Sequence, residues 1–446
     1  MATENSQKNV VLLVLDSLRK DRVSEYNGDI DFTDNIDEIA GEATTYLNAN
    51  AQAPWSLPSH ASMFTGQYPW EHEATQRNIR LETEKKLLAE KFSDSGYVTA
   101  MISPNPWLTG PKGTVKGFSQ VENFIGVRKW RPIKWIMEKG HSLYNKLGKQ
   151  ERELISSLNF TVVDKLVDST KPERTVSKTR KFLQDVDDER FFLFVNLMSA
   201  HEPYTPGNPP KEYLEKHGVY DTEDVPKTER EYLNSDKDLE KTKKAYNAAA
   251  DYTDDLVGEI YGCIQDKNLE DDTVLVITAD HGQALGEGGA FTHAFSVKES
   301  LIDIPLVIRQ PEGESKAKEE IFELRQLYNL LPKLACISDE EVKQLEFAKG
   351  GYEYPELMAG MIPEEEKDRL YRKFLYVKNS SSKIVKTVDS DDQVSYEMIN
   401  LEDEKDIKLD QKMRKKIDEI DDIKESGSLE VEDQEIKERL ENLGYM

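Results

Sequence analysis

The sequence of 446 residues predicts an α/β protein with a largely parallel sheet and helices on both of its faces. The first observation is a set of short apolar runs without polar alternation, which are typical of strands buried on both faces. The second observation is that segments with helical periodicity separate these runs along the chain. The predicted strands are NVVLLVL at 9–15, YVTAMI at 97–102, FFLFVNL at 191–197 and TVLVIT at 273–278.

The other elements are predicted from local patterns. The helical pattern LLAEKFSDSG precedes the strand at 97–102, and Gly96 is the expected stop signal of that helix. Residues at about 120–180 have helical character and predict an insertion. The segment that begins at Arg372 contains three strand-like runs, KFLYV, KIVKTV and VSYEMI, so it predicts a small antiparallel sheet. Residues 403–442 are charge-dense and mostly helical in pattern.

The chain is long enough to form more than one structural unit. We expect a first domain over residues 1–335, with the helical insertion at about 120–180 inside it. We expect a C-terminal subdomain over residues 336–446, which contains the small sheet and the charged helical tail.

The net charge of −26 argues against a nucleic-acid partner, because phosphate groups require a basic surface. Residues 128–150 are an exception, with seven basic residues, one acidic residue and two interleaved tryptophans. One interpretation of this basic segment is a solvated helical face. The other is a lid or docking patch that contacts an anionic substrate or a membrane surface.

The two cysteines and the N-terminus indicate the compartment. Cys263 and Cys336 form no CxxC pattern, so we expect neither a disulfide framework nor a cysteine metal site. The polar N-terminus leads directly into a predicted strand, and no apolar run approaches about 18 residues. These features predict a cytoplasmic protein.

Polar side chains follow the predicted strands at their carboxyl ends, where ligands bind in α/β sheets. Asp16 follows the first strand, His201 follows the third, and Asp280 and His281 follow the fourth. Carboxylates and neutral imidazoles together form ligand sets for Zn²⁺, Mn²⁺, Mg²⁺ or Ca²⁺. The pattern therefore predicts one convergent metal site. The alternative is a helix-capping aspartate beside an incidental histidine.

The segment WSLPSHASMFTG predicts a helix whose N-terminus carries Ser56. Pro58 suits the first helical turn, and the helix N-terminus favours an anion. A metal at this point would activate the Ser56 hydroxyl as a nucleophile. The alternative is that Ser56 or Ser59 only caps the helix, which stabilises it by about 1 kcal/mol. The candidates for binding an anionic group or protonating a leaving oxygen are His60, His201 and His293.

The chain resembles the sulfatase branch of the alkaline phosphatase superfamily, in particular its arylsulfatase-like archaeal and bacterial members. VVLLVLDSLRKD resembles the first strand of that family, with its metal-binding aspartate at Asp16. SLPSHASMFTG resembles the signature C/S-x-P-S-R-x-x-x-x-T-G, with Ser56 in the nucleophile position. TADHGQALGEGG resembles the DHG segment. Further similarities lie in HEPYTP, YTDDLVGEI, YEMINLEDEKD and the terminal KERLENLGYM.

The resemblance implies an alkaline-phosphatase-like three-layer domain with a mixed, mostly parallel sheet, a small C-terminal antiparallel sheet and a helical tail. It also implies one divalent metal ion and conversion of the signature serine to formylglycine, whose hydrate attacks sulfur. Relatives elsewhere in the superfamily attack phosphorus with an unmodified serine or threonine. The implied metal ligands are Asp16, Ser56, Asp280 and His281.

Several positions depart from the sulfatase pattern. His60 stands where sulfatases have arginine, and Ser17 replaces the second of two paired acids. Residues 103–106 align with the family's GKWH segment but lack its lysine and histidine. His293 aligns roughly with a later lysine of the family. These departures leave the choice between sulfate and phosphate esters open.

The predicted function is hydrolysis of a sulfate monoester by a metal-dependent, sulfatase-like enzyme. The metal is Ca²⁺ or Mg²⁺ in a true sulfatase and Mn²⁺ or Zn²⁺ in a phosphoesterase. One alternative is a phosphoesterase or phosphoryl transferase with unmodified Ser56 as nucleophile. Another is a relative that binds an anion or glycan without turnover. The predicted substrate is a small anionic ester or a sulfated or phosphorylated glycan.

Overall fold

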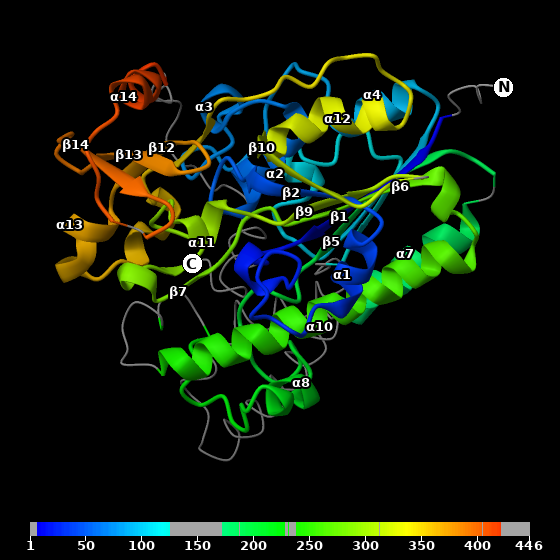
Figure 1. The fold of residues 1–446 in the computed structure, drawn as a ribbon, viewed down its shortest axis with the longest axis horizontal. Helices are drawn as coiled ribbons and strands as arrows, with labels where there is room; N and C mark the ends of the chain where they lie inside the picture. Colours follow the sequence, from blue (N-terminus) through cyan, green and yellow to red (C-terminus); the bar gives the residue numbers. More distant parts are fainter. Residues whose placement is uncertain are drawn as a thin grey trace, which may run out of the picture.

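The central element of the fold is an eight-stranded mixed sheet in the computed structural model (Figure 1). The structure describes residues 7–124, 172–186, 188–227, 231, 238–311, 313–403 and 405–420. Strand β9 runs antiparallel to both of its neighbours, and the other pairings in this sheet are parallel. The prediction of a mostly parallel sheet is thus confirmed. The strand order is β10 (Lys316–Glu323), β2 (Thr44–Asn50), β9 (Leu306–Arg309), β6 (Thr273–Thr278), β1 (Asn9–Leu15), β5 (Phe191–Leu197), β3 (Val98–Ser103) and β4 (Gln120–Asn123).

Strands β1, β5 and β6 form the centre of this sheet, and every residue in them is buried. Helices cover both sheet faces, so these strands carry apolar side chains on both faces rather than an alternating pattern. Strand β1 pairs in parallel with β5 on one side and with β6 on the other. The carboxyl ends of the three strands therefore lie together at one edge of the sheet.

Two helical layers enclose the sheet (Figure 1). Helices α1, α7 and α10 lie on one face, and α8 packs on α10; α2, α4 and α12 lie on the other face with α3 beside them. This arrangement gives the three layers that the sequence predicts. The bounds of these helices are α1 (Asp34–Ala40), α7 (Pro172–Asp185), α8 (Lys211–Lys216), α10 (Leu239–Asp266), α2 (Ser56–Thr65), α3 (Pro69–His72), α4 (Leu88–Asp94) and α12 (Leu327–Leu334).

A separate four-stranded antiparallel sheet follows in the C-terminal part of the chain (Figure 1). Its order is β11 (Ala348–Tyr352), β12 (Lys373–Lys378), β13 (Ser382–Val388) and β14 (Val394–Asn400). The last three strands are the three predicted runs. Two short helices, α11 (Glu299–Ile302) and α13 (Lys367–Leu370), precede them in the chain, and α14 (Gln411–Asp418) follows.

Strand β11 was not predicted because its sequence, AKGGY, contains two glycines, which normally weaken a strand. The structure shows why glycine is needed here. A Cβ atom on Gly350 would lie 2.4 Å from the carbonyl oxygen of Gln52. The neighbouring Gly351 N–H donates a hydrogen bond to the same oxygen at 2.9 Å. The glycines therefore let β11 dock closely on the segment that leads into α2.

The predicted insertion at about 120–180 is helical only in part where the structure describes it. Its first residues form the edge strand β4, and its last residues belong to α7. Residues 125–171, which include the basic segment 128–150, lie outside the described residues, and so do residues 421–446 with KERLENLGYM. Among the helices that the structure describes, none has the length and apolar character needed to span a membrane.

Candidate active site

The first part of the site consists of acidic and imidazole side chains at neighbouring strand ends. Asp16 directly follows β1, and Asp280 and His281 follow β6. Because β1 and β6 are adjacent parallel strands, these residues meet at the same edge of the sheet. All three are fully buried, and their ligand atoms lie within 4.8 Å of one another. The predicted convergence of Asp16, Asp280 and His281 is therefore present.

Ser56 is the first residue of α2, and its side chain faces this cluster. The Ser56 Oγ lies 3.5 Å from Asp16 Oδ2 and 3.3 Å from His281 Nε2. The hydroxyl of Ser59 instead donates to the backbone oxygen of Asp280 at 2.6 Å. The residue before the helix, Trp55, makes no side-chain capping bond. The contacts of both serines thus differ from the simple capping that was the alternative prediction.

The electrostatics of this cluster suit a divalent cation. Among the described residues, only histidines pair with the carboxylates of Asp16 and Asp280, and Asp280 Oδ2 is buried without a hydrogen bond. Burial, assisted by the nearby His293, lowers the pKa of His281 to about 3. The His281 Nδ1–H donates to the Gly282 oxygen at 2.8 Å, which leaves Nε2 as the lone-pair nitrogen. Two carboxylates that have no lysine or arginine partner among the described residues, together with a neutral imidazole, are therefore a ligand set that fits a divalent metal.

Two asparagines hold Asp16 in place, and neither was predicted as a site residue. The Asn105 side-chain amide donates to Asp16 Oδ2 at 2.7 Å, and Asn196 donates to the same oxygen at 3.4 Å. The Asn196 Oδ1 in turn accepts a bond from Ser103 Oγ at 3.2 Å. The signal for Asn105 was its position just after the strand at 97–102. Asn196 lies inside an apolar strand and gave no separate signal.

His60 contacts the backbone of Ser56 rather than its hydroxyl group. Its Nδ1 donates to the Ser56 carbonyl oxygen at 2.8 Å and lies 3.4 Å from Asp280 Oδ2. Its ring packs edge-on against Phe194, with ring centroids 5.8 Å apart. In this position His60 supports the backbone of Ser56 and the carboxylate of Asp280.

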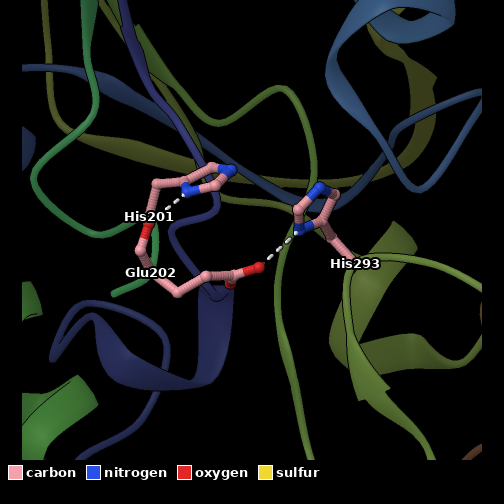
Figure 2. A group of neighbouring side chains, drawn as sticks. All are labelled: His201, Glu202 and His293. Carbon is pink, nitrogen blue, oxygen red and sulfur yellow. Dashed lines mark hydrogen bonds and ion pairs between the residues drawn. The ribbon is translucent and has the colours of Figure 1, made fainter. Parts of the chain in front are cut away.

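His201, Glu202 and His293 form a second buried group (Figure 2). The His293 ring stacks on the His281 ring at a centroid distance of 4.9 Å, so the two groups are in direct contact. The rings of His201 and His293 lie 5.0 Å apart. Glu202 was not predicted, although it directly follows His201 in HEPYTP. All of the predicted site residues, from both groups, therefore lie in one connected cluster.

The charges in the second group are strongly coupled. Burial raises the pKa of Glu202, but His293 and His201 outweigh this effect and lower it to about 2. Burial lowers the pKa of His201, but the carboxylates of Glu202 and Asp16 outweigh it and raise that pKa above its usual value. The Gln283 side-chain amide donates to Glu202 as well. The site as a whole therefore attracts positive charge.

Fold and site define the class of the protein. The fold is that of the alkaline phosphatase superfamily. The solved phosphonate monoester hydrolase of Agrobacterium radiobacter has a TM-score of 0.62 at 16% identity, over 89% of this chain and 90% of that chain. Another solved structure, in complex with its substrate D-glucosamine-2-N,6-O-disulfate, has a TM-score of 0.65 at 15% identity, over 98% of both chains.

The sequence comparison defines the family within this class. The model of the sulfatase family matches residues 8–335, so the chain belongs to the sulfatase family. The uncharacterized sulfatase YidJ of Escherichia coli (strain K12) is 23% identical in an alignment of 361 residues that covers 76% of this chain and 69% of that protein. The family and its hydrolase relatives support an ester hydrolase. Sulfatases generally depend on a metal, and the two buried groups are candidate metal sites.

Proposed function

We propose that this protein hydrolyses sulfate monoesters and that the side chain of residue 56 is the nucleophile. The observation that carries this proposal is the position of Ser56 Oγ, 3.5 Å from Asp16 and 3.3 Å from His281. A hydroxyl that lies against candidate metal ligands and at a helix N-terminus is in a suitable environment for activation. The sulfatase family match supports the choice of substrate class.

We assign the metal to Asp16, Asp280, His281 and the side chain of residue 56. A bound divalent cation would stabilise the charge that develops on the transferred group and lower the pKa of the attacking hydroxyl. Asn105 and Asn196 keep the Asp16 carboxylate oriented. His60 is a positioning residue in this account, because it contacts the Ser56 carbonyl and Asp280 rather than the Ser56 hydroxyl.

His201 and His293 have the proposed role of orienting the anionic group and assisting departure of the leaving oxygen. Both are buried and lie next to the Ser56 cluster. In the sulfatase version of the mechanism, Ser56 is converted to formylglycine and the metal is Ca²⁺ or Mg²⁺. A sulfated sugar is a suitable substrate, by analogy with the related structure that holds D-glucosamine-2-N,6-O-disulfate.

The second candidate function is hydrolysis of a phosphate or phosphonate ester with unmodified Ser56 and Mn²⁺ or Zn²⁺. The observation that favours it is the chemistry around the proposed nucleophile. His60 replaces the arginine of the sulfatase signature, and His293 aligns roughly with a family lysine. The structural similarity to a phosphonate monoester hydrolase also supports this candidate.

The test compares an aryl sulfate and an aryl phosphate as substrates of the metal-loaded protein and of the variant Ser56→Ala. We expect hydrolysis of one of the esters and a loss of about 10³-fold or more in kcat for the variant, because the nucleophile is removed. Mass spectrometry of the peptide that contains Ser56 then separates the two candidates. A mass lower by two hydrogens indicates formylglycine, and an unchanged mass favours the phosphoesterase. Ester hydrolysis at an undiminished rate in Ser56→Ala would contradict both candidates.

A further inference from the structure

The second group, His201, Glu202 and His293, has the composition of a metal site. It combines two imidazoles and one carboxylate, which is a common donor set for Zn²⁺ and related transition metals. The residues come from two segments, one a few residues after β5 and one directly after β8 (Phe291–Thr292). Their exposed fractions are only 2%, 6% and 0%, so a bound ion would be shielded from solvent.

The geometry of the group fits coordination of a single ion. Glu202 Oε1 and His293 Nδ1 lie 3.4 Å apart, which matches the separation of about 3.3 Å between two ligands of a tetrahedral ion at about 2.0 Å. All three ligand atoms lie within 4.8 Å of one another. Figure 2 shows the carboxylate of Glu202 directed at the His293 ring, with the ring of His201 beside them.

Neighbouring hydrogen bonds orient two of the three side chains, as expected for metal ligands. His201 Nδ1 donates to the backbone oxygen of Glu202 at 2.7 Å, which assigns Nε2 as the ligand atom of this histidine. The Gln283 side-chain amide donates to Glu202 Oε2, so that Oε1 is the oxygen that faces His293.

The charge of the site supplies an independent argument. The carboxylates of Asp16, Asp280 and Glu202 are buried together, and among the described residues no lysine or arginine pairs with them. One divalent cation neutralises two of these three carboxylates, and the third needs a further positive charge, either a proton on an imidazole or a second cation. Without that further charge, an anionic ester would be repelled in a buried site, where electrostatic interactions are weakly screened. A second divalent cation makes the site positive overall.

We propose that His201, Glu202 and His293 bind a second divalent transition-metal ion beside the one held by Asp16, Asp280 and His281. The role of this ion rests on the proposed function, because it would lie next to the ester group that Ser56 attacks. His201 and His293 then act on the substrate through the ion rather than directly. Two such ions together stabilise the attacking and the leaving oxygen of an in-line displacement.

The experiment counts bound metal. Full-length protein is stripped with a chelator, equilibrated with Mn²⁺ or Zn²⁺, separated from free metal by gel filtration and analysed by mass spectrometry of the elements. We expect two ions per chain in the wild type and one in His293→Ala and in Glu202→Gln. The matched control is His217→Gln, whose histidine pairs with Asp251 outside the site and whose loss should leave two ions bound.

Electron paramagnetic resonance of the Mn²⁺-loaded wild type provides a second readout that needs no variant. Two neighbouring ions should give a spin-coupled spectrum, whereas one ion gives the spectrum of isolated Mn²⁺. One ion per wild-type chain, or two ions retained in folded His293→Ala, would overturn the proposed second site. Two bound ions without hydrolysis of any ester would contradict the proposed function alone, whereas one ion with Ser56-dependent hydrolysis would contradict only the second site.

Discussion

At the scale of single residues, the candidate site depends on side chains that hold the metal ligands in position. Asp16 is the clearest case, because its carboxylate is fully buried and accepts bonds from Asn105, Asn196 and Ser17. Such bonds fix the direction of the oxygen lone pairs before a metal arrives. They also reduce the cost of burying the charge.

The variant Asn105→Ala should therefore weaken the binding of metal at Asp16. We expect a loss of about 10–100-fold in metal affinity, as is typical when a residue that orients a ligand is removed. Titration of the stripped protein with Mn²⁺, monitored by activity and by calorimetry, measures this affinity. The control is Asn48→Ala, which removes a half-buried side chain bonded to the Glu319 oxygen, and the metal affinity of this variant should equal that of the wild type. An unchanged affinity in Asn105→Ala would contradict the assigned role.

At the scale of elements, the C-terminal sheet supports the helix that carries Ser56. Trp55 and Leu57 belong to the same buried apolar cluster as Tyr352 of β11 and Tyr376 of β12. The Tyr376 hydroxyl also donates to the Ala51 oxygen in the segment before α2. The position of the proposed nucleophile thus depends on two sheets that lie far apart in the sequence.

A group of ion pairs also joins the C-terminal sheet to α11, which precedes that sheet in the chain. Glu299 of α11 lies 2.5 Å from Lys378 Nζ of β12 and 2.8 Å from Lys383 Nζ of β13. Both lysine side chains are only 4% exposed. Burial raises the pKa of Glu299, but the two lysines outweigh this effect and lower it to about 2.

The variant Glu299→Gln should destabilise the protein by about 3 kcal/mol at pH 7, because it leaves two buried ammonium groups without their main partner. The folded-state pKa of Glu299 lies below its unfolded value of 4.5, so its contribution is complete above that pH and is lost as the pH falls toward 2. Urea unfolding at pH 7 and pH 3 should therefore show a smaller difference between variant and wild type at the lower pH.

The matched control for this experiment is Glu364→Gln, which removes the same charge from an exposed pair with Lys367. An exposed pair of this kind contributes about 0.5 kcal/mol or less. Equal stabilities of Glu299→Gln and Glu364→Gln at pH 7 would contradict the role assigned to the buried pairs.

At the scale of the whole molecule, the fold was largely predictable because long-range pairing follows from simple local patterns. The apolar runs at 9–15, 191–197 and 273–278 are the three central strands, and their parallel pairing brings Asp16, His201 and Asp280 to one edge. The short strands β4 and β11 were not predictable. The exposed residues of β4 and the glycines of β11 show no strand pattern until the neighbouring chain is present.

The candidate site was predictable to a lesser extent, because strand ends identify residue types but not their contacts. The sequence indicated His60 as a group that faces the anion, whereas in the structure it contacts Asp280 and the Ser56 backbone. Glu202, Asn105 and Asn196 are recognised as site residues only from their contacts in the structure. Their roles depend on which oxygen they bond, and no sequence pattern encodes that.

Metal removal should affect the stability of the whole molecule, since a ligand that binds only the folded state stabilises it. We expect the chelator-treated protein to lose about 3 kcal/mol relative to protein at a metal concentration of about 100 times Kd, with a lower melting temperature. Calorimetric melting measures this change. The variant Asp280→Asn should respond less to added metal. Identical melting with and without metal would contradict the proposed metal centre.

The measurement that most directly tests the central claim is acid-quenched mass spectrometry of the peptide that contains residue 56 during turnover. The account predicts that this residue carries the sulfuryl or phosphoryl group taken from the ester, and that no such adduct forms in Ser56→Ala. Attachment of the group to another residue, or turnover in Ser56→Ala at the wild-type rate, would contradict the assignment of Ser56 as the nucleophile.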